Sequence, residues 1–198
     1  MTTPAQGSVH PMPWLAEVCR RIGINEGRRA TMYLDSATPP CRTIAIGFNL
    51  ERNDARKALA SIGVADVGGV MGGHVALTDN QIDALFGYSF APILSESRSS
   101  LAPGIFDAMT DARRFVICDL VFNMGLAGWM AFTGTRQLLN EAQAAKNTGD
   151  ADAHLLFGEA ADHLTASCWY TQVGNRAKRD VAMIKNGVWV DAYGDGSP

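Results

Sequence analysis

Residues 115–122 constrain the fold of this chain more than any other segment. Their sequence, FVICDLVF, is apolar at every position except Asp119. A helix with apolar residues on all sides must be covered by other elements, and therefore belongs inside a core. The sequence thus predicts a buried central helix in the second half of the chain, with other helices packed around it.

Three further helices are expected to surround the central one. Apolar residues at helical spacing, separated by glycines, place these helices at residues 136–146, 151–166 and 175–186. The chain has 198 residues, of which 47% are hydrophobic, so it has enough apolar material for a sizeable core. The second half is therefore predicted to form a helical lobe.

The first half of the chain is predicted to contain both helix and strand. A helix begins at Pro13 and is expected to end at Gly23 or Gly27. Residues 43–48 alternate between large apolar and small side chains. This alternation predicts a single strand, with large side chains on one face and small ones on the other.

Two shorter segments follow this strand. A short helix is expected over residues 54–62, with Asn53 as its N-cap. The glycine-rich residues 68–73 are expected to be flexible and to separate the two halves of the chain.

A long helix is expected to join the two halves. Thr78 and Gln81 have the spacing of a capping box, which marks a helix start, whereas Pro92 predicts a kink or break within the helix. The predicted fold is α+β and mainly α-helical, with two lobes. Its parts are a loose tail (residues 1–12) and one domain (13–198) composed of lobes 13–77 and 100–193 and the joining helix 78–99.

Charge and composition argue against several function classes. The chain has 17 Lys and Arg against 20 Asp and Glu, a net charge of −3, unlike a nucleic-acid-binding protein or a cationic membrane peptide. No apolar run approaches the roughly 20 residues that span a bilayer, and no signal peptide is expected. The four cysteines are far apart, so free thiols in a reducing cytoplasm are expected.

No metal or cofactor is expected. His154 and His163 are half a turn out of phase on a helix, so they cannot share a metal ion. The glycine-rich residues 68–73 lack the Gly-Lys-Ser/Thr sequence of a phosphate-binding loop.

Two acids near the strand are candidates for catalysis. Glu26 follows the first helix, and Asp35 precedes the loop that leads to the strand. Cleavage of a glycosidic bond needs one carboxyl that protonates the leaving oxygen and a second group that assists water or stabilises positive charge. Thr43 and Gly47 share the small-residue face, where a sugar ring could approach. The alternative is that both acids are merely solvated and that Thr43 is simply a good strand former.

A basic cluster opens the last predicted helix. Residues 165–186 contain Arg176, Lys178, Arg179 and Lys185 against Asp180, which gives +3 (4 − 1). An arginine that faces a cleft could hold a carboxylate, while its neighbours could meet an anionic polymer. A solvated helix face is the alternative.

The order of these motifs resembles the phage-type lysozymes of the T-even phage lysozyme family. The resemblance covers roughly residues 18–193. The matching segments are INEGRR (24–29), YLD (33–35), TIAIG (43–47), DARR (111–114), VFNMG (121–125), AFT (131–133), WY (169–170), NRAKR (175–179), GVW (187–189) and DAY (191–193).

This resemblance implies a muramidase, which hydrolyses the β-1,4 bond between N-acetylmuramic acid and N-acetylglucosamine in peptidoglycan. Glu26 would be the general acid. Asp35 and Thr43 would position and activate the attacking water, or stabilise the developing positive charge. Arg176 would lie against Glu26 from the other lobe, and Asn123 would be a cleft-facing amide.

The chain departs from the family pattern in three respects. Residues 36–42 make seven positions between the Asp and the Thr, where the family typically has five, so the extra Pro-Pro turn is expected at a hairpin tip. Phe48 stands where many members have His, which is expected to affect stability more than mechanism. The chain is also slightly acidic, whereas these lysozymes are often basic.

The leading hypothesis is therefore a phage lysozyme that degrades the host cell wall. The alternatives are a lytic transglycosylase, which needs the acid but no water-activating Asp, and a non-catalytic peptidoglycan-binding module. The expected protein is a monomer without nucleic-acid partner or stable membrane insertion. It would remain in the host cytoplasm until its release to the wall, or be carried in the virion.

Overall fold

The structure, a computed structural model, describes residues 13–35 and 38–190; the predicted tail over residues 1–12 lies outside them. The described chain is mainly helical and has one small antiparallel sheet, which confirms the predicted α+β class. Its contacts divide it into two units, the first ending at Tyr88 and the second beginning at Ser89. The helix α4 contains this boundary.

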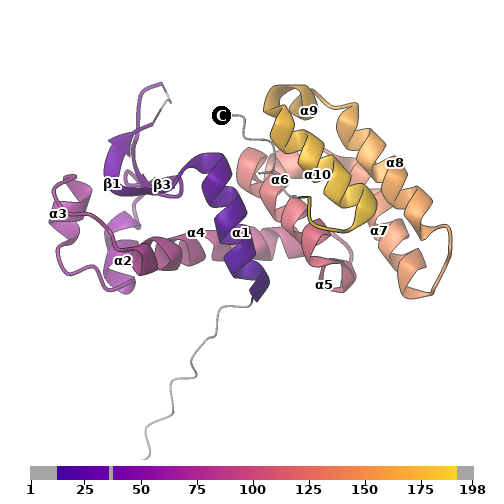
Figure 1. The fold of residues 1–198 in the computed structure, drawn as a ribbon, viewed down its shortest axis with the longest axis horizontal. Coiled ribbons are helices and arrows are strands. Elements are labelled where there is room, and N and C mark those ends of the chain that lie inside the picture. Colours follow the sequence, from indigo (N-terminus) through magenta and orange to yellow (C-terminus); the bar gives the residue numbers. More distant parts are fainter. Residues whose placement is uncertain (1–12, 36–37, 191–198) are drawn as a thin grey trace, which may run out of the picture. The chain divides into compact units, whose positions relative to one another are not determined.

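Figure 1 labels the helices and the strands β1 and β3; β2 lies between these two strands in the sheet. The strands β1 (Arg29–Leu34), β2 (Arg42–Ala45) and β3 (Phe48–Asn49) form the sheet in that order. The helices are α1 (Pro13–Glu26), α2 (Ala55–Ser61), α3 (Val67–Met71), α4 (Asp79–Ser99), α5 (Ile105–Ala108), α6 (Asp111–Met130), α7 (Thr133–Asn147), α8 (Ala153–Thr165), α9 (Cys168–Val173) and α10 (Asn175–Asn186).

The prediction of one strand over residues 43–48 is wrong. Strand β2 ends at Ala45, the chain reverses, and β3 pairs back so that Ile44 lies opposite Phe48. Gly47 has a φ of +68°, a conformation that glycine adopts without steric cost, and it makes this reversal possible. The alternating pattern therefore belongs to two short strands and their turn.

The glycine-rich residues 68–73 do not separate two halves but lie within the first unit, where residues 68–71 belong to α3. The Asp66 carboxylate caps this helix by accepting the N–H of Gly69 at 2.8 Å. A Cβ on Gly69 would lie only 2.6 Å from Cγ2 of Val75. Glycine at this position therefore permits close packing.

The short helix predicted at residues 54–62 exists as α2, but its N-cap is Asp54 rather than Asn53. Asp54 makes no side-chain cap. Its carboxylate instead binds Arg52 and accepts a hydrogen bond from the hydroxyl of Tyr88 at 3.2 Å. These contacts join α2 to α4. They hold the Asp54 carboxylate away from the helix N-terminus, and the predicted N-cap, Asn53, lies one residue before the observed one.

The capping box before α4 is confirmed. The Gln81 N–H donates to the Thr78 hydroxyl at 3.3 Å, and the Thr78 N–H donates to the Gln81 side chain at 2.9 Å. The helix then continues past Pro92, so the break expected there does not occur. Pro92 is exposed, and its ring is therefore accommodated on the outer side of the helix.

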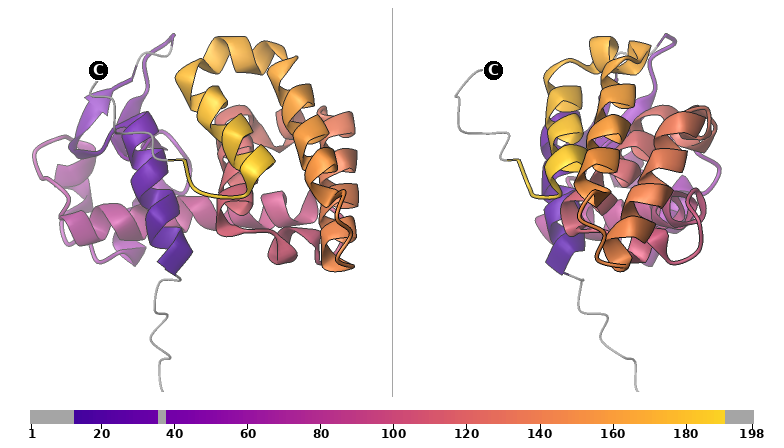
Figure 2. Two further views of the ribbon diagram at one scale, coloured as in Figure 1. Left: turned by 45° about the vertical axis from the view of Figure 1, so that its right-hand side comes forward. Right: turned by 90° about the vertical axis from the view of Figure 1, so that its right-hand side faces the viewer.

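The second unit is built around α6, as the sequence predicted. The residues of α6 that are buried include those at positions 115–121, and Asp119 is among them. In Figure 2, α8 lies between α7 and α10, and it packs against both. Trp129 near the end of α6 is fully buried and donates its indole N–H to the Ser100 hydroxyl at 2.7 Å. The short helices α5 and α9 were not predicted.

Within residues 13–35 and 38–190, no single helix is both long and apolar enough to cross a membrane. The helices α6 and α7 satisfy those criteria only as a pair, and they are bent by 107° at the break between them. The same residues contain no group of three or more His, Cys, Asp or Glu side chains arranged to hold a metal ion.

Replacing Pro92 by Ala should stabilise the protein. Proline lacks the N–H that would bond to the carbonyl one turn earlier, and in a helix interior it costs about 3 kcal/mol relative to alanine. We expect Pro92→Ala to raise the free energy of unfolding by about 1–3 kcal/mol in urea titrations. The exposed control Ser95→Ala in the same helix should change it by less than about 0.5 kcal/mol. A destabilised Pro92→Ala variant would contradict this explanation.

Candidate functional site

Asp35 and Thr43, which the sequence singled out, are hydrogen-bonded to one another at the end of the β1–β2 hairpin. The Thr43 hydroxyl donates to Oδ2 of Asp35 at 3.2 Å, and the Cys41 N–H donates to Oδ1 at 2.9 Å. Thr43 is 4% exposed, and Asp35 is half-buried. Oδ1 of this carboxylate is therefore held by a backbone donor, whereas Oδ2 competes for the Thr43 hydroxyl proton with the Cys41 carbonyl, which lies 3.3 Å from that hydroxyl.

The longer loop between Asp35 and Thr43 leaves this pair intact. The Asp35 N–H donates to the Cys41 carbonyl at 3.0 Å, which closes the hairpin directly after the strands. Tyr33 then lies opposite Thr43 in the register. Pro39 and Pro40 lie beyond this closure, so the expectation of the Pro-Pro turn at a hairpin tip is confirmed.

Glu26 is the last residue of α1, and its side chain is half-buried. Gly27 follows with a φ of +81°, which confirms the second of the two predicted helix ends. Because β1 begins at Arg29, three residues after Glu26, Glu26 lies at the corner between the helix and the sheet.

Tyr33 connects the two candidate acids electrostatically. Burial raises the pKa of its phenol, Arg29 opposes this effect, and the carboxylates of Asp35 and Glu26 raise it further. Directly opposite residues of an antiparallel pair point to the same side of a sheet, so Tyr33 and Thr43 share a face. Sequence reasoning gave Tyr33 no role, although it precedes Asp35 by only two residues.

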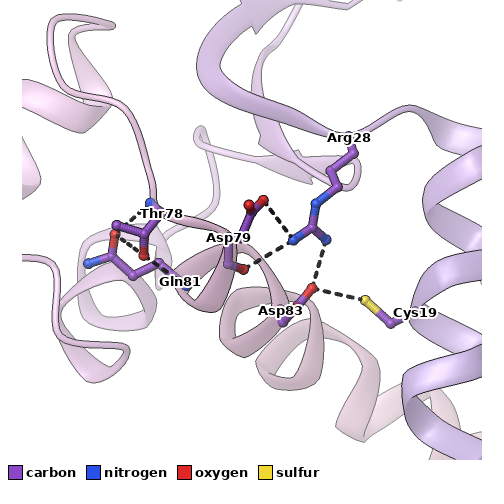
Figure 3. A network of polar contacts seen from close by, with 6 residues as sticks. All are labelled: Cys19, Arg28, Thr78, Asp79, Gln81 and Asp83. Carbon is purple, nitrogen blue, oxygen red and sulfur yellow. Dashed lines mark hydrogen bonds and ion pairs between the residues drawn. The ribbon is translucent and has the colours of Figure 1, made fainter.

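Arg28 joins the corner after Glu26 to the beginning of α4 (Figure 3). Its guanidinium donates to Oδ1 of Asp83 at 2.7 Å, and to the carbonyl and the carboxylate of Asp79 at 3.1 and 3.2 Å. The thiol of Cys19 on α1 donates to the same Asp83 oxygen at 3.5 Å. Exposed ion pairs stabilise a fold little, but this fork fixes where the corner lies against α4.

In the second unit, Arg176 of α10 forms a paired hydrogen bond with Asp119 of α6. The two nitrogen–oxygen distances are 2.7 and 2.8 Å. The Asp119 side chain is fully buried, and that of Arg176 is 12% exposed. The predicted contact of Arg176 with Glu26 would link the two units and stays a prediction.

Asn123 is exposed in α6, two residues before the kink at Gly125, and its side-chain oxygen accepts the indole N–H of Trp169 at 3.2 Å. It thereby connects α6 to α9. Gly47 is exposed at the β2–β3 turn. Phe48, where the resembling family often has His, is 3% exposed and lies under the guanidinium of Arg52 at 5.3 Å. Substrate contacts of Asn123 and Gly47 stay predictions.

The four cysteines should differ in reactivity. Burial raises the pKa of Cys19 to about 11 and that of Cys118 to about 12, whereas Cys168 is exposed and Cys41 half-buried. Since the thiolate is the nucleophile, iodoacetamide at about pH 8 should label Cys41 and Cys168 first, as read by peptide mass spectrometry.

The variant Asp83→Asn tests the cause of the Cys19 shift. After burial, Asp83 is the next contribution that raises the pKa of Cys19. Its removal should accelerate labelling of Cys19, by less than about tenfold because burial remains. Cys118 is the internal control, and its labelling rate should not change. An unchanged rate at Cys19 would mean that Asp83 does not act on the thiol.

Comparison with known proteins finds similarity to a lysozyme. No family model matches the chain. The chain is 27% identical over 175 residues to "Probable T4-type lysozyme 1" from Dictyostelium discoideum, and the alignment covers 85% of this chain and 93% of that protein. The small three-stranded sheet followed by a helical unit is consistent with this similarity. The chain therefore has a lysozyme-like fold of the α+β, mainly helical class.

Proposed function

We propose that this protein is a muramidase that hydrolyses the β-1,4 bond between N-acetylmuramic acid and N-acetylglucosamine in peptidoglycan. The observation that carries the proposal is the Thr43–Asp35 hydrogen bond, together with a half-buried acid, Glu26, at the end of α1; the carboxylates of Asp35 and Glu26 both raise the pKa of Tyr33. Similarity to a T4-type lysozyme over most of the chain supports the same enzyme class.

Glu26 acts as the general acid in the proposed mechanism. Breaking the bond between C1 and the glycosidic oxygen leaves negative charge on that oxygen, and protonation by a positioned carboxyl removes the charge. The corner between α1 and β1 presents Glu26 for this step. Arg28 supports the corner through its fork on Asp79 and Asp83.

Asp35 and Thr43 assist the attacking water. Oδ1 of Asp35 is held by the Cys41 N–H, which fixes the carboxylate plane, and Oδ2 lies against the Thr43 hydroxyl. A water that is hydrogen-bonded to both Oδ2 and this hydroxyl gives one proton to Asp35 while its oxygen bonds to C1, with inversion. In the other form of the mechanism, the Asp35 carboxylate stabilises the positive charge that develops on the sugar ring.

The remaining predicted residues have supporting roles in the proposal. Arg176, oriented by Asp119, binds an anionic group near the reacting bond. Asn123 contacts the sugar chain, and Gly47 allows a ring to approach the backbone of the turn. The protein acts as a monomer on peptidoglycan.

Lysis of a bacterial host by a phage is the setting that we propose for this activity. The protein would be released from the host cytoplasm to the wall, or carried by the virion. The motif order resembles the T-even phage lysozymes, although the reported relative comes from Dictyostelium discoideum. Between the enzymatic alternatives, a carboxylate that is paired with a hydroxyl favours a hydrolase over a lytic transglycosylase, which needs no water-activating Asp.

Replacing Glu26 by Gln tests the general acid. The amide keeps the shape but has no acidic proton, so peptidoglycan turnover should fall about 10²–10⁴-fold in a turbidity assay. The matched control Glu51→Gln, an exposed acid in the same unit, should keep wild-type activity. A folded Glu26→Gln protein that lyses cell walls as fast as wild type would show that Glu26 is not the general acid.

Thr43 offers a second test of the water-assisting pair. Thr43→Val removes the hydroxyl while keeping the branched shape, and should lower kcat about 10-fold or more with little change in KM. Thr43→Ser keeps the hydroxyl and should retain most of the activity. Equal activity of the Val and Ser variants would show that the hydroxyl has no role in the reaction.

A further inference from the structure

Asp180 is a second buried acid beside the Asp119–Arg176 pair. It follows Arg176 by four positions on α10, so the two side chains lie on the same face of the helix. Asp180 is 2% exposed and Asp119 is fully buried. Two carboxyl groups and one guanidinium therefore share the interface between α6 and α10.

The hydrogen bonds assign different charges to the two acids. Asp119 uses both oxygens to bind Arg176, so one negative charge is matched by one positive charge. Among the residues that the structure describes, the buried Oδ2 of Asp180 has no hydrogen-bond partner. An ionised carboxylate in this position would be a second negative charge without a donor, which is costly. A protonated Asp180 becomes a donor itself, and Asp119 is the acceptor beside it.

The surrounding charges support a protonated Asp180. Burial raises its pKa well above 3.8, and the charge of Asp119 and the hydrogen bond that a protonated Asp180 donates to it raise it further, while Arg176 and Arg179 oppose the shift without cancelling it. Arg113 of α6 is turned to the Ile184 and Lys185 carbonyls. The other charged or titratable side chains on α8 and α10 occupy exposed positions: His154, Glu159, Asp162, His163, Lys178 and Lys185.

We propose that Asp180 is a positioning residue that carries a proton in the working enzyme, donates it to Asp119 and so keeps Arg176 in place. Loss of this proton leaves two adjacent carboxylates that repel each other and compete for one guanidinium. Arg176 is then released from its fixed geometry. The consequence for activity rests on the proposed function, whereas the consequence for stability does not.

The sign of the stability effect follows from proton linkage. Above about pH 3.8 the unfolded chain releases the Asp180 proton while the folded protein retains it, so the unfolded state binds fewer protons. The contribution of this proton to stability is therefore lost progressively as pH rises from about 3.8 through the folded pKa. An amide at position 180 keeps a donor for Asp119 and cannot ionise, so it abolishes this loss.

The test compares wild type with Asp180→Asn and with Asp162→Asn, an exposed acid on α8. Melting temperatures are measured from about pH 4 to about pH 9. The melting temperature of Asp180→Asn should exceed that of wild type by an amount that grows with pH, whereas Asp162→Asn should run parallel to wild type. Parallel curves for Asp180→Asn and wild type would overturn the proposal.

The pH profile of kcat/KM on purified peptidoglycan tests the positioning role. The pH at which kcat/KM falls on the alkaline side should be higher in Asp180→Asn than in wild type by about one pH unit or more. Asp180→Leu has no hydrogen-bond donor at this position, so its kcat should be lower than that of wild type at every pH. Asp180→Asn keeps a donor and should retain most of the kcat. An unmoved alkaline limb would overturn the role in positioning. If wild type releases no muropeptides, the proposed function fails. The melting temperatures measured against pH still test whether Asp180 carries a proton in the folded protein.

Discussion

The paired hydrogen bond between Asp119 and Arg176 organises the helical unit. The buried part of the central helix α6 carries two charged side chains, Arg113 and Asp119, and Asp119 is the acid that must have a partner there. Arg176 supplies that partner from α10, with both nitrogen–oxygen distances below 3 Å. Removal of one member of such a buried pair costs about 3–5 kcal/mol, because the other charge stays behind without compensation. The position of α10 against α6 is thus set by charge as well as by shape.

The first unit depends on strand register in the same way. The hydrogen bond between Thr43 and Asp35 exists because the hairpin closes between Asp35 and Cys41. A slip of one residue would turn Thr43 to the other face of the sheet and separate the pair. The Arg28 fork on α4 then fixes the corner that contains Glu26. The register of β1 and β2 therefore brings Asp35 and Thr43 together, and the ion pairs of Arg28 connect the corner after Glu26 to α4.

Sequence patterns predicted the elements whose signal is local. The apolar run at residues 115–122 identified α6, and the Thr78–Gln81 spacing identified the start of α4, because both signals lie within one or two helical turns. The strand prediction at residues 43–48 failed because alternation cannot distinguish one strand from two strands joined by a tight turn at Gly47.

Long-range pairing was beyond the reach of these patterns. Asp119 was visible only as a polar interruption, since its partner lies 57 residues away in the sequence. The Arg28 fork spans 55 residues to Asp83 for the same reason. The order of family motifs implied a shared role for Asp35 and Thr43 but did not predict their hydrogen bond, which the register of β1 and β2 makes possible.

Mass spectrometry of the fragments released from isolated peptidoglycan tests the central claim most directly. If Asp35 and Thr43 assist water, each cleavage adds one water molecule, and the fragments end in a reducing N-acetylmuramic acid. Fragments that end in 1,6-anhydro-N-acetylmuramic acid would contradict this account, because they form without water and leave the pair with no role.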